Sequence, residues 1–391
     1  MPDSIVIVGA KRTPIGALQG KFNSVAAPQL GAVAIKAALE QAGVKPTEVE
    51  DLIFGCVLPA GQGQAPARQA ALGAGLDKST PSTTVNKMCG SGMKAAMMAA
   101  DELVAGSAKI VVAGGMESMT NAPHLLPKAR GGYRYGHQRV LDHMAFDGLE
   151  NAYDGKPMGF FADKTAEKYG ITREQMDGFA RVSTERAVSA SNSGAFADEI
   201  APVTVAGRKG DEVVSTDETP FTVNVDKIPT LRPAFNKDGL VTAATSSSIS
   251  DGAAALVMMS ESLAKARGAK PLARIVAYAS NAHEPEWFTT APVGAIRKVL
   301  EKAGWKAADV DLWEVNEAFA VVTMAAMKDV GIAHEKVNVN GGACALGHPI
   351  GATGARIITT LIYALKNRGL RKGVAALCIG GGEATAIALE V

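Results

Sequence analysis

Cys89 lies in a segment whose residue types could support nucleophilic catalysis. Residues 85–92 read VNKMCGSG, which is typical of a strand end, a glycine-rich turn and a helix start. The free N–H groups and the dipole at a helix start favour a thiolate. The glycines would permit a strained turn that exposes the sulfur. A small cysteine packed in a tight turn gives the same pattern, so both interpretations stay open from these residues alone.

His348 lies in a second glycine-rich segment and could act as a base. Residues 338–351 read NVNGGACALGHPIG, so Gly347 and Pro349 restrict the backbone on both sides of the histidine. A histidine held in this way can accept the proton of a thiol nucleophile. A purely structural histidine is the alternative. Cys344, in the same segment, is interpreted as a packing residue.

Two further polar or reactive residues follow apolar strands. Cys378 ends such a strand and precedes three glycines, residues 380–382, whose N–H groups could hold an oxyanion. Taken alone, Cys378 would be interpreted as a core residue, but a run of three glycines indicates that something approaches this backbone closely. Asn316 interrupts another strand end, where a buried amide must be hydrogen-bonded or hold a ligand or water.

Other common catalytic patterns do not occur in the sequence. There is no phosphate-binding P-loop, and residues 351–354 lack the full glycine spacing of a dinucleotide fingerprint. The six histidines form no zinc-type arrangement, and none of the four cysteines forms a CxxC pair. We therefore expect neither a metal nor a bound cofactor.

The elements that carry these residues occur twice along the chain. Residues 31–58 and 294–320 each read as an amphipathic helix that ends at Ala-Gly, a short turn and an apolar strand. Residues 85–117 and 339–383 each run from Val-Asn through a glycine-rich turn into a helix and then a strand. The expected helices cover 93–103 and 355–365. The strands end before Glu117 and Glu383.

This repeat predicts a duplicated α/β fold. The strands are apolar throughout, for example at 110–113 and 374–379, as in central strands buried on both faces. Two such halves would pack about a pseudo-dyad with equivalent loops facing each other. A site between them would draw on both halves.

The middle of the chain does not follow the repeat. We predict an N-terminal half over 1–120 that is completed by about 246–270, an inserted loop or lid domain over 121–245, and a C-terminal half over 271–391. A helix is expected at 173–191 with its N-cap at Thr172. Insertions of this length usually carry substrate contacts.

Composition narrows the classes of partner. The chain has 391 residues with 40 basic and 39 acidic side chains, so its net charge of +1 does not indicate a nucleic-acid surface. No apolar stretch is long enough for a bilayer, so no membrane partner is expected. The scattered cysteines favour a reducing compartment, and the cytoplasm is the predicted location.

At the level of whole motifs, the sequence resembles the thiolase family from end to end. The resemblance rests on several long motifs in one order: NKMCGSGMKA (86–95), GGMESM (114–119), RPAF (232–235), SDGAAALV (250–257), NEAF (316–319), NGGACALGHPIGATGAR (340–356) and CIGGG (378–382). It implies two intertwined α/β halves in an αβαβα layering with a loop domain. It also implies a homotetramer built as a dimer of dimers.

The resemblance further implies a role for each candidate residue. Cys89 would accept the acyl group and His348 would take the Cys89 proton. Cys378 would exchange the α-proton of the second acyl-CoA. Asn316 would hold a water that forms one oxyanion hole with His348, and the N–H groups of Cys89 and Gly380 would form the other. Acyl-CoA and CoA would be substrates, contacted by Leu149, Met158, Phe235, Ala243, Ser247, Ala318 and Phe319.

The motifs favour an acetyl-CoA acetyltransferase activity, which condenses two acetyl-CoA molecules. Short-chain members usually carry His-Met-Gly in the lid, where this chain has Pro157-Met158-Gly159. They carry Gly-Asn-Ala-Ser where this chain has residues 244–247, ATSS. The loss of the lid histidine removes one expected pantetheine contact. The second departure leans toward the degradative members, the broader 3-ketoacyl-CoA thiolases of fatty-acid β-oxidation, whereas residues 284–292 resemble the acetoacetyl-type members.

Two rival functions are weighed against this one. A decarboxylating ketoacyl synthase would normally lack a second catalytic cysteine, so Cys378 argues against it. A non-catalytic thiolase-like carrier of acyl chains or sterols could keep the pocket and lose a catalytic group. All four catalytic motifs are present here, which argues against the carrier.

Overall fold

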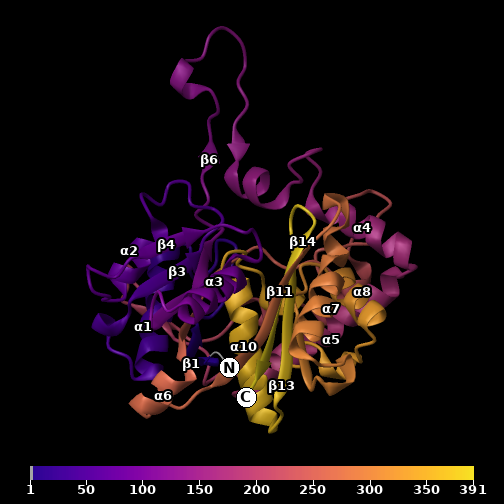
Figure 1. Cartoon of the computed structure of the whole chain (residues 1–391). Helices are drawn as coiled ribbons and strands as arrows, with labels where there is room; N and C mark the ends of the chain where they lie inside the picture. Colours follow the sequence, from indigo (N-terminus) through magenta and orange to yellow (C-terminus); the bar gives the residue numbers. More distant parts are fainter. Residues whose placement is uncertain (1–2) are drawn as a thin grey trace.

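The computed structural model describes residues 3–391 and has a mixed α/β architecture (Figure 1). Within these residues, ten strands form one sheet in the order β12-β13-β14-β11-β1-β10-β5-β3-β4, with β2 paired to β10. The N-terminal side of this sheet comprises β4 (Ser82–Val85), β3 (Asp51–Gly55), β5 (Ile110–Ser118), β10 (Ser250–Ser260), β1 (Ile5–Arg12) and β2 (Gly16–Ala17). The C-terminal side comprises β11 (Ala273–Ala282), β14 (Glu383–Glu390), β13 (Lys372–Ile379) and β12 (Leu312–Val315).

The two sides of the sheet meet through a short antiparallel pairing. Residues 5–7 of β1 pair with residues 273–275 of β11, while β1 also pairs along its length with β10. The remaining pairings stay within one side. Each side is therefore a nearly complete sheet of its own, and the two are joined at a narrow seam.

Helices cover the sheet in three layers, which confirms the predicted αβαβα arrangement. α1 (Ala27–Ala42) and α2 (Pro66–Gly73) pack outside the N-terminal sheet, and α7 (Ala291–Ala303) and α8 (Ala320–Val330) lie on the outer side of the C-terminal sheet. α3 (Ser91–Ala105) and α10 (Thr353–Arg368) contact each other and strands of both sides (Figure 1). These two helices form the middle layer.

The internal repeat is present in the structure. α1 and α7 both end at a glycine with positive φ, Gly43 at +62° and Gly304 at +66°. Each is followed by a 3-10 turn and a strand, Pro46–Glu48 before β3 and Ala307–Asp309 before β12. One element is reduced in the second copy. Where the first half has strand β4 beside β3, the second half has a single bridge between Trp313 and Val337.

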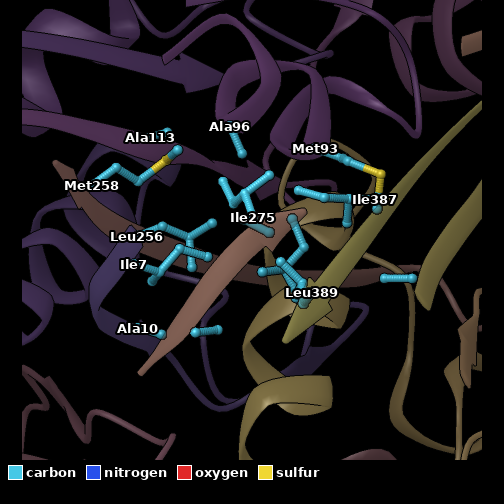
Figure 2. Packing of buried hydrophobic residues seen from close by; sticks show 14 of the residues in the cluster. Ile7, Ala10, Met93, Ala96, Ala113, Leu256, Met258, Ile275, Ile387 and Leu389 are labelled. Carbon is cyan, nitrogen blue, oxygen red and sulfur yellow. The ribbon is translucent and has the colours of Figure 1, made fainter. Parts of the chain in front are cut away.

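The core of the middle layer consists of aliphatic side chains from both halves. The residues labelled in Figure 2 come from β1, α3, β5, β10, β11 and β14: Ile7, Ala10, Met93, Ala96, Ala113, Leu256, Met258, Ile275, Ile387 and Leu389. All but Ile275 are at most 1% exposed. Because neither half can bury this surface alone, the two halves form one folding unit.

Glycines allow the two middle helices to approach at their starts. A Cβ on Gly92 of α3 would lie 2.8 Å from the Ala355 nitrogen, and a Cβ on Gly354 of α10 would lie 2.2 Å from the Met93 nitrogen. The two glycines occupy equivalent positions, each the second residue of its helix. The pseudo-dyad therefore passes between the two helix starts.

The segment between the halves contains helices and a projecting arm. Thr172 caps α5 (Arg173–Asn192) by accepting a hydrogen bond from the Gln175 nitrogen, as predicted. The arm comprises residues 124–142 and stands away from the body (Figure 1). The remaining elements here are β6 (His124–Leu125), β7 (Leu141–Asp142), a π-helix (Met144–Leu149), α4 (Met158–Tyr169), β8 (Val203–Val205) and β9 (Glu212–Val214).

Two short helices complete the fold, α6 (Glu261–Arg267) after β10 and α9 (Ala343–Leu346) before α10. Strand β10 follows the inserted segment in sequence and lies in the N-terminal sheet. The division of the chain at 120, 245 and 270 stays a prediction. Among residues 3–391, no helix is both long and apolar enough to cross a membrane.

Candidate active site

Cys89 lies in the turn between β4 and α3, and polar contacts hold this turn. The Ser91 hydroxyl donates to the Met88 carbonyl at 2.6 Å and accepts from the Lys87 nitrogen at 2.9 Å. The Asn86 side chain accepts from the Met88 nitrogen at 2.9 Å. The backbone before the sulfur is therefore fixed by its own side chains.

The strain in this turn lies at Met88 rather than at a glycine. Met88 has φ +46°, whereas Gly90 has φ −84°. Gly90 is required for space, because its Cβ would lie 2.3 Å from Cδ1 of Ile379. The expectation that the glycines supply the strained conformation was wrong. They allow the other half of the molecule to approach.

The environment of Cys89 favours the thiol over the thiolate. Burial raises the pKa of Cys89 to about 11, although the N–H groups of Gly380 and of Cys89 itself favour the thiolate. The backbone donors therefore act in the direction that the sequence predicted, but desolvation outweighs them. Formation of a thiolate at Cys89 would need a base.

His348 is poised as a neutral hydrogen-bond acceptor. The Thr353 hydroxyl donates to the Pro349 carbonyl at 2.9 Å, so it accepts from Nδ1–H of His348 at 2.6 Å. Nε2 of His348 is buried and has no hydrogen-bond partner within residues 3–391. Burial, with the charge of Arg356, lowers the pKa of His348 to about 3. Nε2 thus carries a free lone pair.

Equivalent hydroxyls hold the two catalytic loops. Ser91 is the first residue of α3 and secures the Cys89 turn, and Thr353 is the first residue of α10 and secures His348. The same kind of hydrogen bond, from the first residue of a helix, therefore occurs in both halves. It holds a cysteine loop in one half and a histidine loop in the other.

Cys378 lies at the end of β13, inside the protein. It is 0% exposed, and burial together with the nearby Cys89 raises the pKa of Cys378 well above its usual range. It is therefore a thiol at neutral pH.

The three glycines after Cys378 form the turn between β13 and β14. Gly381 and Gly382 have φ of +91° and +86°, and a Cβ on Gly382 would lie 2.4 Å from the His283 carbonyl oxygen. The sequence indicated that something lies close to this glycine backbone, and residues 283–284 are part of it. Gly380 directs its N–H toward the Cys89 sulfur.

Asn316 follows β12 and is 1% exposed. Its backbone nitrogen donates to the Ala376 carbonyl at 2.9 Å. Neither atom of its side-chain amide has a hydrogen-bond partner in the described chain. A buried amide in this state is suited to hold a polar ligand.

Glu317, the next residue of the same motif, supports the segment that leads to His348. Its carboxylate accepts from the Ser183 hydroxyl at 2.7 Å, the Asn338 side chain at 2.8 Å and the Cys344 nitrogen at 3.1 Å. Cys344 is fully enclosed, and burial raises the pKa of its thiol. This agrees with the interpretation of Cys344 as a packing residue.

A cavity of about 500 Å³ is bordered by some of these groups. Cys89, His348 and Gly380 line it, whereas Asn316 and Cys378 are not among its lining residues. The seven residues expected to contact the substrate all line it: Leu149, Met158, Phe235, Ala243, Ser247, Ala318 and Phe319. Most of its surface is apolar, as expected of a site for an acyl or pantetheine group.

Sequence reasoning missed part of this wall. Phe288 and Ile249 also line the cavity, and the Phe288 and Phe319 rings lie edge to face with centroids 6.4 Å apart. Phe288 lies in a 3-10 turn, Pro285–Thr290, where no periodic pattern marks it. Among residues 3–391, no group of three His, Cys, Asp or Glu side chains could hold a metal ion.

Comparison with known proteins agrees along the whole chain. Family models described as the thiolase N-terminal and C-terminal domains match residues 5–262 and 269–391. The chain is 50% identical over 388 residues to an acetyl-CoA acetyltransferase of Chromobacterium violaceum, with 99% of both chains covered. It is 51% identical over 393 residues to acetyl-CoA acetyltransferase 2 of Arabidopsis thaliana, covering 100% of this chain and 98% of that one.

A solved structure gives the same result. The crystal structure of a Bacillus anthracis acetyl-CoA acetyltransferase superimposes with a TM-score of 0.97 at 42% identity, covering 99% of this chain and 98% of that chain. The family models and the solved structure thus match both halves of the chain, including the motifs at the cavity. The chain belongs to the thiolase family of acyltransferases.

Proposed function

We propose that this chain is an acetyl-CoA C-acetyltransferase, which reversibly condenses two acetyl-CoA molecules to acetoacetyl-CoA and CoA. The observation that carries the proposal is the meeting of Cys89, His348 and Gly380 on one apolar cavity. The names of the relatives support acetyl-CoA as the substrate.

The first half of the reaction is written most simply in the direction of thiolysis. His348 takes the Cys89 proton on Nε2, and the Cys89 thiolate attacks the 3-keto carbon of acetoacetyl-CoA. The N–H groups of Cys89 and Gly380 stabilise the resulting oxyanion. The bond between carbons 2 and 3 then breaks, which leaves acetyl-Cys89 and the enolate of acetyl-CoA.

Cys378 completes this half by protonating carbon 2 of the enolate, and acetyl-CoA departs. The Nε2–H of His348 and a water held by Asn316 would stabilise the enolate oxygen until then. The raised pKa of Cys378 suits a group that begins the reaction as an acid.

In the second half, CoA enters and gives its thiol proton to the Cys378 thiolate. The CoA sulfur attacks acetyl-Cys89, and the released Cys89 thiolate recovers its proton from His348. All three residues return to their starting protonation states. Condensation is the same sequence reversed, so the mechanism is ping-pong in both directions.

A broader 3-ketoacyl-CoA thiolase of fatty-acid β-oxidation is the second candidate. The departure at residues 244–247 favours it. Pro157, which lines the cavity beside Met158, removes one pantetheine contact expected of the short-chain members. A non-catalytic carrier of acyl chains or sterols is the more distant candidate.

One experiment separates the three functions. We would measure CoA-dependent cleavage of acetoacetyl-CoA beside a long-chain 3-ketoacyl-CoA, with the wild type and Cys89→Ala. Cleavage of acetoacetyl-CoA alone, lost in the variant, supports the acetyltransferase. Comparable cleavage of both substrates supports the broader enzyme. No cleavage by folded wild type contradicts catalysis and favours the carrier.

We further propose a homotetramer in the cytoplasm that needs no cofactor beyond its CoA substrates. Exposed apolar side chains on the projecting arm support assembly. Four free cysteines are in keeping with a reducing compartment.

A further inference from the structure

Glu117 is a buried carboxylate near the active site that the reaction above does not use. It lies at the end of β5 in the GGMESM motif and is 0% exposed. Its Oε1 accepts a hydrogen bond from the Leu58 nitrogen at 3.0 Å, and its Oε2 accepts from the Val57 nitrogen at 3.0 Å and the Gly351 nitrogen at 2.9 Å. Three backbone N–H donors on two separate segments thus converge on one side chain, and the Cys56 thiol also donates to Oε1 at 3.7 Å.

The Val57 and Leu58 donors belong to the segment against which the proposed nucleophile, Cys89, packs. Val57 and Leu58 follow β3 and form a small apolar cluster against which Met88 and Cys89 pack. The Cys56 nitrogen, next in the same segment, donates to the Val85 carbonyl at 3.1 Å, just before the Cys89 turn. The Glu117 carboxylate therefore holds the segment beneath Cys89 through both of its oxygens.

The third donor belongs to the loop of the base, in the other half of the molecule. Gly351 lies between His348 and Thr353, the residue that fixes Nδ1 of His348. Its carbonyl oxygen is enclosed by the N-terminal half, because a Cβ on Gly115 would lie 2.0 Å from it and a Cβ on Gly55 would lie 2.7 Å from it. The loop of residues 348–353 therefore packs closely against Gly55 and Gly115, and Glu117 binds its Gly351 nitrogen.

We propose that Glu117 is a positioning residue that fixes His348 relative to Cys89 across the junction of the two halves. Both carboxylate oxygens accept hydrogen bonds, so an amide at this position would turn an NH₂ group toward an N–H donor. This conflict loosens one of the two segments. Since proton transfer from Cys89 to Nε2 needs hydrogen-bond distance, a small displacement of the loop slows catalysis.

The test uses Glu117→Gln in the full-length protein and rests on the proposed function. In acetoacetyl-CoA thiolysis we expect kcat to fall at least about tenfold. KM for CoA should stay within about twofold, since the substrate-contacting residues lie on other segments. Glu40→Gln, the same change at an exposed site on α1, should match the wild type.

A double-mutant cycle with His348→Asn separates positioning from general stability. If Glu117 acts through His348, Glu117→Gln should cost less than about threefold further in the His348→Asn background. Equal losses in both backgrounds, or a Glu117→Gln enzyme as active as the wild type, would overturn the proposal.

If Glu117→Gln does not fold, Glu117→Asp takes its place in the same cycle, since it keeps the charge and shortens the reach by one methylene. An inactive wild type would instead defeat the proposed function. That result is distinct from an active wild type that Glu117→Gln leaves unchanged.

Discussion

Cys89 and His348 line the same cavity, and both are uncharged at rest. The pKa of Cys89 is raised to about 11 and that of His348 is lowered to about 3, in both cases mainly by burial. Proton transfer between them is therefore unfavourable until a substrate carbonyl accepts the charge as it develops. This arrangement protects the sulfur from reaction in the absence of substrate.

Alkylation of Cys89 should show this directly. Because the thiolate is the reactive form, the rate of inactivation by iodoacetamide should rise roughly tenfold per pH unit and continue to rise above pH 9, toward about 11. Acetyl-CoA should protect the enzyme by acylating the same sulfur. The measurement is residual activity against time at a series of pH values. A plateau below about pH 8 would contradict a raised pKa.

Cys378→Ser should separate the two chemical steps. Transfer of the acetyl group between CoA and Cys89 exchanges sulfur leaving groups, which are stable as anions, so it should fall less than about tenfold. Formation of the carbon–carbon bond needs a base for a carbon acid and should fall more than about 100-fold. Isotope exchange between labelled CoA and acetyl-CoA measures the first step, and acetoacetyl-CoA formation measures the second. Equal losses would argue against this division.

Residue identities at the site could be predicted from the sequence, but their physical state could not. The motifs identified Cys89, His348 and Gly380, which meet at one cavity. The raised pKa of Cys89 could not be predicted because desolvation depends on the whole enclosure, which no local pattern contains. Met88 was missed as the strained residue because φ +46° at a methionine has no sequence signal.

Among the elements, the starts of α3 and α10 decide the geometry of the site. Each helix begins with a hydroxyl residue that secures a catalytic loop, and each has glycine at its second position where the two helices meet. A side chain at either glycine would push the helices apart. The spacing of nucleophile and base is thus set by helix packing.

Gly92→Ala should destabilise the protein and Gly178→Ala should stabilise it. The Cβ at position 92 would lie 2.8 Å from a backbone nitrogen, which costs about 1–3 kcal/mol. Gly178 lies in α5 with nothing within 4 Å of its Cβ position, so alanine there adds about 0.5–1 kcal/mol of helix stability. Urea unfolding followed by circular dichroism measures both. Changes of the same sign would refute the packing argument.

The repeated elements were predictable because they carry matching periodicity and stops. The predicted helices at 93–103 and 355–365 are two or three residues shorter at each end than α3 and α10. The reduction of the β4 equivalent to one bridge at Val337 was not predicted. Residues 337–340, VNVN, read much like the VN that ends β4, and only pairing across the sheet distinguishes them.

For the whole molecule, the arm of residues 124–142 is the feature that a single chain does not explain. Tyr135 is fully exposed, and Leu126 and Val140 are each half exposed, on a segment that stands away from the body (Figure 1). Apolar groups so placed support the proposed assembly with other chains. The sequence marked this region as an insertion, but its extended shape has no periodic signal.

Replacing Leu126, Tyr135 and Val140 together by serine should break the proposed tetramer into dimers. The three side chains make no core contact here, so the fold of each chain should survive. Light scattering coupled to size-exclusion chromatography gives the mass. The control is Val104→Ser, which removes a similarly exposed apolar side chain from α3. An unchanged mass for the triple variant would remove the arm from the assembly.

The crossing of α3 and α10 on the pseudo-dyad also bears on how such an enzyme could arise. In a dimer of two identical chains, the residues facing each other across the axis would be the same, cysteine against cysteine or histidine against histidine. Two identical, symmetry-related groups have the same proton affinity, so neither pair offers both an acid and a distinct base. Once a gene duplication joins the two copies, each helix start can mutate independently. Asymmetric acid–base chemistry then becomes possible on what was a symmetry axis.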